Sequence, residues 1–452
     1  MIVLSRSPLT LVLARSRSFF PRSPLTLFLL PLTLFLLTAM PSPSAAQSAD
    51  RSLERARRLL RSTPLIDGHN DLPWEIRQRK DAPRDVAAYD LRTPTAGHTD
   101  LSRLAQGQVG GQFWSIYIPG EIGDSGYAKV QLEEFDIARR IIARYPDRLQ
   151  LALTADDIER SFKRGRIASL LGMEGGHAIE NSLGALRSYY DLGARYMTLT
   201  HNVTLDWADA ALDSARNNGL TEFGREVVRE MNRLGMLVDL SHVSPATMSD
   251  VLDGTEAPVI FSHSSAKALT DHGRNVPDSI LKRLPQNGGV VMVTFVPAFV
   301  SPVVAAWEAQ AKEQSSAIKE AVSDTVDQKR RFEDWKATHP RPSATLKQVA
   351  DHIEHVRKVA GSDHVGIGSD FDGIDTVPEG LEDVSKFPQL FAELIRRGWS
   401  DRDLKKLAGQ NVLRALRAAE ATAARLQKVR QPSTKTIEQL DGQKSVTRKE
   451  KT

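Results

Sequence analysis

The amino-acid sequence predicts an α/β fold, a closed (β/α)8 TIM barrel. Eight short apolar runs alternate with segments whose apolar residues recur at helical spacing, as in residues 132–142 and 223–234. Runs that are apolar almost throughout are typical of parallel strands buried on both faces, and eight such units are the number that closes a barrel. An open, doubly wound sheet is the alternative, but no Gly-x-Gly-x-x-Gly turn follows the first run.

The eight strand candidates are separated, in most cases, by a segment long enough for a helix. In chain order they are residues 64–67, 112–118, 167–173, 196–199, 236–239, 259–262, 289–294 and 365–368. A polar insert, residues 305–341, separates strands 7 and 8 and is rich in Ala, Glu, Gln and Lys. This composition predicts one or two solvent-exposed helices that end at Pro340 and Pro342. We interpret the insert as a decoration of the barrel rather than as part of a catalytic site.

The barrel domain is expected to span residues 47–430. Helical patterns between residues 387 and 423 are expected to complete its outer layer. The polar and basic stretch 431–452 is expected to be a disordered tail, and it carries no apolar end of the kind that precedes a glycolipid anchor.

Residues 1–46 have the features of an export signal. They contain four Arg and no acidic residue, an apolar stretch at 25–37, and small residues at Ser44 and Ala46, three and one positions before a cleavage site. The apolar stretch is interrupted by Pro31 and is short for a membrane span of about 20 residues. We therefore expect a signal peptide at 1–46, export to a periplasm or the extracellular medium, and no permanent membrane anchor.

Charge and cysteine content exclude several classes of function. The formal net charge is +4, and it comes from the four Arg of residues 1–46, because the other 56 Lys and Arg match 56 Asp and Glu. No basic field suited to nucleic acid remains. The chain has no cysteine, which excludes disulfides, thiolate-bound metal and a catalytic thiol. A metal would have to bind His and carboxylate side chains.

Side chains of the metal-ligand type follow six of the eight strands at the same end. They are His69 and Asp71, Glu174 and His177, His201, His242, His263, and Asp370 and Asp372. A single His at a strand end is more often a hydrogen-bonded structural residue than a ligand. Six such ends in one barrel make that explanation improbable, because the carboxyl ends of the strands are where barrel enzymes build their sites.

Seven motifs of the chain resemble those of the membrane (renal-type) dipeptidase family, in the family's order between about Leu65 and Ala418. They are Asp67-Gly-His69-Asn-Asp71, Glu174-Gly-Gly-His177, Thr200-His201-Asn202, His242-Val-Ser244, Phe261-Ser-His263-Ser-Ser265, Arg274-Asn275-Val-Pro277-Asp278 and Asp370-Phe-Asp372-Gly373. The chain departs from the family in its lack of cysteines, its insert at 305–341 and its lack of an anchoring tail. These departures concern the family's disulfide-linked dimer and membrane attachment rather than its chemistry.

The resemblance implies a binuclear zinc site on a barrel of the metal-dependent hydrolase type. His69 and Asp71 would hold one Zn²⁺, His242 and His263 the other, and Glu174 would bridge the two. A bridging carboxylate is physically reasonable because two dications a few ångströms apart repel strongly. Ligands that are all nitrogen or oxygen suit zinc, with Mn²⁺ or Co²⁺ as substitutes.

The resemblance also implies the reaction: hydrolysis of L-L dipeptides, with L-D dipeptides left open, by a metal-bridging hydroxide. Glu174 would hold the metals, His201 would stabilise the oxyanion, and Asp370 would carry the proton to the leaving nitrogen, with Asp372 as second choice. Arg274 would pair with the terminal carboxylate of the substrate. His201, Arg274 and Asp370 would therefore contact the substrate.

Two other classes of function stay open at this point. One is another metal-dependent amidohydrolase on the same barrel, such as a deacylase or lactonase. The other is an exported binding protein without catalysis. We expect dipeptides as the substrate partners, no nucleic acid, and leave a homodimer open. The loop 202–218 is expected to line the pocket, although Trp207 fits the core equally well, and Asp67 is expected to support a ligand rather than to be one.

Overall fold

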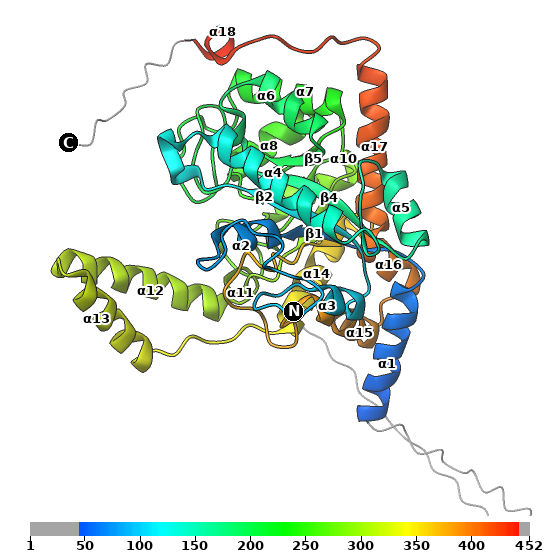
Figure 1. The fold of residues 1–452 in the computed structure, drawn as a ribbon, viewed down its shortest axis with the longest axis vertical. Coiled ribbons are helices and arrows are strands. Elements are labelled where there is room, and N and C mark those ends of the chain that lie inside the picture. The colour runs from blue at the N-terminus through cyan, green and yellow to red at the C-terminus, as the bar shows by residue number, and fades with distance from the viewer. Residues whose placement is uncertain (1–44, 443–452) are drawn as a thin grey trace, which may run out of the picture. The chain divides into compact units, whose positions relative to one another are not determined.

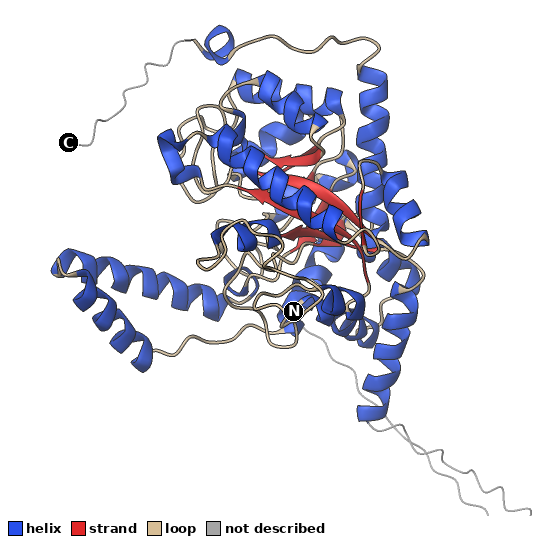
Figure 2. Cartoon of the chain, in the orientation of Figure 1, coloured by secondary structure: helices blue, strands red, loops and turns tan. Residues whose placement is uncertain are grey.

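The computed structural model describes residues 45–442, and its strands form a closed, all-parallel barrel surrounded by helices (Figure 2). The strand order is β2-β1-β9-β8-β7-β6-β5-β4, and pairing of β2 with β4 closes the ring. The barrel strands are β1 (Leu65–Asn70), β2 (Val109–Tyr117), β4 (Ile167–Glu174), β5 (Ala194–Thr198), β6 (Leu237–Asp239), β7 (Ile260–Phe261), β8 (Val290–Val293) and β9 (Val365–Ile367). Each overlaps one of the expected strands, so the predicted TIM barrel is confirmed.

One further strand, β3 (Leu149–Leu151), was not predicted from the sequence. It pairs only with the first residues of β4, Ile167–Ser169, and lies outside the ring of eight. A strand of three residues is too short to show an apolar period, which explains why the pattern did not reveal it.

The barrel interior is filled by large side chains that come from alternate strand positions. Fully buried examples are Phe113 on β2, Leu170 on β4, Ile260 on β7 and Met292 on β8. Tyr196 of β5 fits beside Gly172 of β4, where an added Cβ would lie only 2.0 Å from the Tyr196 ring. The glycine therefore leaves room for a large ring in the barrel, directly below the carboxyl end.

Amphipathic helices cover the outside of the barrel (Figure 1). α7 is typical: Thr221 caps its first turn, Val227 and Met231 are buried, and Gly235 ends it in the left-handed conformation with φ 83°. The helices of this layer are α4 (Tyr127–Arg144), α5 (Ala155–Lys163), α6 (Leu183–Asp191), α7 (Glu222–Leu234), α8 (Pro245–Gly254), α14 (Leu346–Ala360), α15 (Phe387–Arg396) and α17 (Asn411–Leu426).

Shorter helices and the N-terminal helix complete the described chain. They are α1 (Ala45–Leu60), α2 (Leu72–Gln78), α3 (Leu101–Gln106), η1 (Gly120–Ser125), η2 (Gly176–Ile179), α9 (Asp278–Leu281), α10 (Leu284–Asn287), α11 (Pro297–Val300), η3 (Val384–Lys386), α16 (Asp401–Lys405), the π-helical η4 (Lys406–Gln410) and α18 (Ile437–Asp441). α2 matters most for the site, because it begins directly after the end of β1.

The predicted helical insert is confirmed as a hairpin of two exposed helices, α12 (Pro302–Ala321) and α13 (Thr325–Thr338), between β8 and β9. The hairpin projects away from the barrel (Figure 1), and α13 buries none of its residues. Rings of Trp307, Phe332 and Trp335 pack against one another and join the two helices.

The two ends of the chain differ in what can be compared with the predictions. The expected signal peptide lies outside the described residues except for Ala45 and Ala46, which begin α1. The tail was expected to be disordered from residue 431; its described part, residues 431–442, includes α18 and contacts the rest of the chain. Its Ser433 carbonyl accepts a hydrogen bond from Arg187, and Asp441 accepts one from the backbone of Phe223. These contacts with α6 and α7 supply partners that composition alone does not reveal.

None of the described helices combines the length and the apolar character needed to cross a membrane.

Candidate metal centre and substrate cavity

The predicted metal ligands meet at the carboxyl end of the barrel. His69 and Asp71 come from the end of β1, Glu174 from the end of β4, and His242 and His263 directly follow β6 and β7. All five side chains are buried; Asp71 and Glu174 are 4% exposed and His69 is fully covered. Because the strands of a closed parallel barrel end on one rim, residues distant in sequence converge there.

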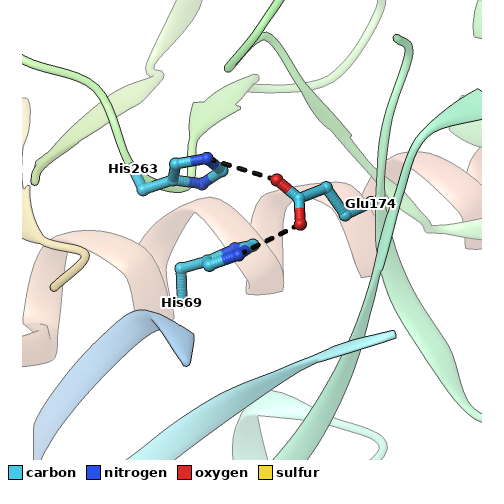
Figure 3. Close-up of side chains that lie close together, drawn as sticks. All are labelled: His69, Glu174 and His263. Atoms are coloured by element: carbon cyan, nitrogen blue, oxygen red, sulfur yellow. Dashed lines mark ion pairs between the residues drawn. The ribbon is translucent and has the colours of Figure 1, made fainter. Parts of the chain in front are cut away.

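Glu174 is the centre of this cluster (Figure 3). Its Oε2 lies 3.3 Å from His69 Nε2, and its Oε1 lies 3.0 Å from His242 Nε2 and 3.4 Å from His263 Nε2. Asp71 Oδ2 is 3.2 Å from His69 Nε2 on the Oε2 side. The two oxygens of one carboxylate therefore face two different sets of nitrogen and oxygen ligands.

The three histidine rings are held through their other nitrogen, Nδ1. His69 Nδ1 lies 3.0 Å from the Tyr196 hydroxyl, whose proton is donated to the carbonyl of Gly68. His263 Nδ1 lies 2.8 Å from Ser262 Oγ, which in turn donates to a carboxylate of Asp239. With the hydroxyl protons assigned to these oxygen acceptors, each histidine donates from Nδ1–H. This places the lone pair of the neutral His263 ring on Nε2, and a metal ion that displaces the second proton of His69 would meet its lone pair on Nε2 as well.

His242 follows the same rule, because its Nδ1 lies 3.1 Å from the amide oxygen of Asn202. With Nδ1 as donor, the Nε2 lone pairs of His242 and His263 face each other at 2.9 Å. Two facing acceptors repel unless a cation lies between them. His69 Nε2 is likewise buried without a hydrogen-bond partner among the described residues. This set of donors therefore fits a divalent metal ion. Ligands that are all nitrogen or oxygen atoms suit zinc, manganese or cobalt.

Burial and neighbouring charges shift the pKa values of the side chains in this cluster in different directions. Burial lowers the pKa of His242 and His263 well below the usual histidine value, so both rings are neutral at pH 7. Burial acts on His69 in the same direction, but Tyr196 and the neighbouring carboxylates outweigh it and hold the pKa of His69 well above its usual value. Burial also raises the pKa of Glu174, yet the imidazoles around it outweigh this effect and hold it well below the usual range. A metal ion would compete with the proton on His69.

A cavity of about 660 Å³ opens over the cluster, within the range of ~300–1,000 Å³ usual for small-molecule sites. His201 and Asp370 line it beside the predicted ligands. His201 Nε2 is 4.0 Å from Glu174 Oε1, and Asp370 Oδ1 is 4.0 Å from His69 Nε2. Burial lowers the pKa of His201 and raises that of Asp370 well above the usual aspartate value. A neutral imidazole can donate one hydrogen bond, and a carboxyl group with a raised pKa can hold a proton.

Three residues at this rim have left-handed backbone conformations that side chains rarely adopt. They are His242 with φ 68°, Asp370 with φ 70° and Asp372 with φ 64°. Strain of this kind, about 1–3 kcal/mol per residue, persists where the surrounding structure over-determines the backbone, and it gathers at functional sites.

Arg274 lines the cavity and forms no ion pair with any side chain in the described part of the chain. It is 1% exposed, its Nη1 and Nη2 lie 3.5 and 3.4 Å from Ser264 Oγ and the His263 carbonyl, and its guanidinium lies over the Phe299 ring. Burial lowers its pKa to about 10, so the group is still a cation at neutral pH. Asp370 and Glu174 act on its charge from beyond ion-pair distance. A buried cation with no carboxylate in direct contact is a site for an anionic group.

Asp372 and Asp67, two further residues considered from the sequence, lie outside the ligand cluster. Asp372 lines the cavity but contacts His98 rather than the ligand cluster, so Asp370 is the carboxylate nearer to His69. Asp67 accepts hydrogen bonds from Ser369 and Gln112 and contacts none of the ligand rings. It joins β1 to its neighbours and does not orient a ligand directly.

The loop 202–218 reaches the cavity through Asn202 and Leu212 only. Trp207 is fully buried and packs on Phe223, as the alternative core interpretation predicted. The remaining histidines expected to be ordinary take part in local hydrogen bonds or ring stacking; they are His177, His272, His352, His355 and His364.

Sequence reasoning did not identify the groups that hold the ligands. Tyr196, Ser262 and Asn202 each anchor one histidine, and Tyr117 stacks its ring edge on His201 with the centroids 4.8 Å apart. The available signal was position, because Ser262 and Asn202 are the chain neighbours of His263 and His201. Tyr196 carried no such signal, since it reaches His69 across the barrel.

Comparison with known proteins agrees with this geometry. The family described as membrane dipeptidase (peptidase family M19) matches residues 53–430. Among solved structures, the chain is similar to the probable dipeptidase PvdM from Pseudomonas aeruginosa, with 24% identity, 83% of this chain and 100% of the other covered, and a TM-score of 0.71. At that identity the likeness concerns the fold.

Two further solved structures similar to this chain are described as metallo peptidases. A metallo peptidase from Rhodobacter sphaeroides, liganded with a phosphinate mimic of the dipeptide L-Ala-D-Ala, is 25% identical over 79% of this chain and 99% of its own, with a TM-score of 0.65. The metallo peptidase dipeptidase AC is 27% identical over 79% of this chain and 98% of its own, with a TM-score of 0.64.

We expect Tyr196→Phe to lower the affinity for divalent metal by about 10- to 100-fold, the usual effect of removing a partner of a ligating histidine. The lost hydroxyl is the acceptor for His69 Nδ1–H, so the ring loses its orientation. Competition with a chelator measures the affinity. Tyr189→Phe is the matched control, because its buried hydroxyl bonds only to the Ala178 carbonyl. Equal metal affinities of the two variants would contradict the anchoring role.

Proposed function

The chain belongs to the membrane dipeptidase family and is a metal-dependent hydrolase that acts on dipeptides; from that premise we propose that it is an exported two-zinc dipeptidase. The observation that carries the proposal is the arrangement of Glu174, which faces two sets of donors with its two oxygens. His69 and Asp71 would hold one ion and His242 and His263 the other, with Glu174 shared. When bound, two such ions supply Lewis acidity and a water of lowered pKa.

Arg274 would fix the substrate by its terminal carboxylate. The guanidinium is buried, charged at neutral pH and without an acidic partner among the described residues, so a carboxylate would complete its contacts. A substrate bound in this way has its C-terminal residue beside Arg274, and the family supports a dipeptide rather than a longer peptide as the substrate.

His201 and Asp370 would handle charge and protons at the reacting bond. His201 is neutral, and one of its ring nitrogens would donate a hydrogen bond to the oxyanion that develops from the carbonyl. Asp370 would receive a proton at its carboxylate and deliver it to the leaving nitrogen, for which its raised pKa is suited. Its backbone is left-handed, with φ 70°, and the residue lines the cavity.

The C-terminal residue of the substrate would be either an L- or a D-residue. The support for this is the similar Rhodobacter sphaeroides metallo peptidase, which was liganded with a mimic of L-Ala-D-Ala. Every predicted ligand position is filled by a competent side chain, which argues against a binding protein without catalysis.

We expect the purified enzyme to hold about two zinc ions per chain and to hydrolyse both L-Ala-L-Ala and L-Ala-D-Ala. A chelator should abolish both activities, and added Zn²⁺, Mn²⁺ or Co²⁺ should restore them. Elemental analysis and product assays measure the two quantities. One ion or fewer per chain in fully active enzyme would contradict the binuclear site.

Arg274→Ala should raise KM for dipeptides and lower kcat/KM by about 100-fold, because the buried charge pair with the substrate carboxylate is lost. The same dipeptide with a C-terminal amide serves as the matched substrate, since it has no carboxylate to lose. Its hydrolysis should change far less. An equal loss for both substrates would mean that Arg274 does not bind the carboxylate.

Export is supported by the sequence of residues 1–46, which has the features of a signal peptide. Expressed in a Gram-negative bacterium, the full chain should appear in the periplasmic fraction or the medium with its N-terminus shortened. N-terminal sequencing of the fractionated protein measures this. Full-length protein that stays in the cytoplasm would contradict export.

A further inference from the structure

Three carboxylates form one wall of the substrate cavity, and we call Glu75, Asp372 and Asp375 the acidic wall. Glu75 lies on α2, directly after β1, while Asp372 and Asp375 follow β9, the strand beside β1. Arg274 enters the cavity from the segment after β7, which β8 separates from β9. The cavity therefore has an acidic wall and a separate cationic group, with the Glu174 cluster in its floor.

The acidic wall lacks basic partners in the part of the chain that the structure describes. No Lys or Arg lies within ion-pair distance of its three carboxylates; Glu75 accepts a hydrogen bond only from the neutral Gln78 side chain. Asp372 is 8% exposed, and its Oδ2 has no hydrogen-bond partner. Asp372 Oδ1 accepts the backbone N–H of His98, and the His98 Nδ1 lies 3.7 Å from the same oxygen.

Carboxylates that have no Lys or Arg within ion-pair distance in a partly buried wall favour a cationic ligand. Burial raises the pKa of Glu75, and the charge of Asp372 acts in the same direction, against the weaker opposing effects of Gln78, His98 and Arg79. A positive charge placed between the two carboxylates would stabilise both of them. Trp74 and Ile374 line the cavity beside the acidic wall. Together they offer apolar surface for the methylene stem of a long side chain and carboxylates for its charged end.

The orientation of the bound dipeptide determines which of its two residues lies beside the acidic wall. With its carboxylate at Arg274 and its peptide bond over Glu174, the C-terminal residue occupies the β7 side of the cavity. The N-terminal residue then lies toward β1 and β9. We propose that the acidic wall selects dipeptides whose N-terminal residue has a cationic side chain, lysine or arginine; this inference rests on the dipeptidase function proposed above.

The main alternative is that the wall binds only the α-ammonium group of the substrate. That group is common to all dipeptides, whereas a side-chain cation distinguishes one dipeptide from another. Loss of a wall carboxylate would therefore affect all substrates equally in the alternative, and cationic ones selectively in our proposal.

The test compares kcat/KM for L-Lys-L-Ala and L-Met-L-Ala, which are similar in length but differ in side-chain charge. The zinc-loaded full chain should prefer Lys-Ala by at least about fivefold, the factor expected for one partly exposed ion pair. Glu75→Gln keeps the size of the side chain and should remove most of this preference. Asp375→Asn, at the exposed rim, should reduce it independently. Glu75→Lys should reverse it and favour L-Glu-L-Ala.

Glu379→Gln is the matched control, because Glu379 is exposed, lies four residues beyond Asp375 and does not line the cavity. It should leave both rates and their ratio unchanged. A ratio that does not respond to Glu75→Gln and Asp375→Asn, or an equal loss for both substrates, would overturn the proposal while leaving dipeptide hydrolysis in place. Failure of the loaded wild-type chain to hydrolyse either dipeptide would instead contradict the proposed function.

Discussion

The structure of the site depends on one buried carboxylate, Glu174, held between imidazole nitrogens that carry lone pairs. An ionised carboxylate that is 4% exposed is costly unless positive charge or strong donors surround it. Among the described residues, its one hydroxyl donor is Ser115, 3.1 Å from Oε2. His69, whose pKa is held well above its usual value, supplies part of the compensating charge, whereas the facing His242 and His263 are neutral. Divalent cations resolve both problems together, since they neutralise the carboxylate and accept the lone pairs.

Side chains inside the barrel orient the histidine rings that surround Glu174. Tyr196 stands in the barrel interior because Gly172 leaves it room, and its hydroxyl reaches up to His69. Asp239, at the end of β6, accepts from Ser262 and from Thr198, so one carboxylate links three strands and orients His263 through Ser262. The packing of side chains inside the barrel therefore determines the orientation of the ligating histidines. A substitution in the barrel interior would alter the metal site even though it replaces no ligand.

The parts of this structure that sequence could predict are those that follow from strand geometry. Apolar runs marked the eight barrel strands, and the closure of a parallel barrel then required His69, Glu174, His242 and His263 to converge. The order of the tail beyond residue 431 could not be predicted, because it depends on α6 and α7 offering partners such as Arg187. The Tyr196 anchor was equally hidden, since a contact across the barrel leaves no periodic trace in the chain.

The distribution of charge gives the cavity a direction. Arg274 is a buried cation on the β7 side, while Glu75 and Asp375 are carboxylates on the side of β1 and β9. A dipeptide is itself a dipole, with its carboxylate at one end and its ammonium at the other. Reversal of the substrate would bring like charges together at both walls, so the charge distribution would disfavour that orientation. In the proposed orientation, with the substrate carboxylate at Arg274, the scissile bond would lie over Glu174.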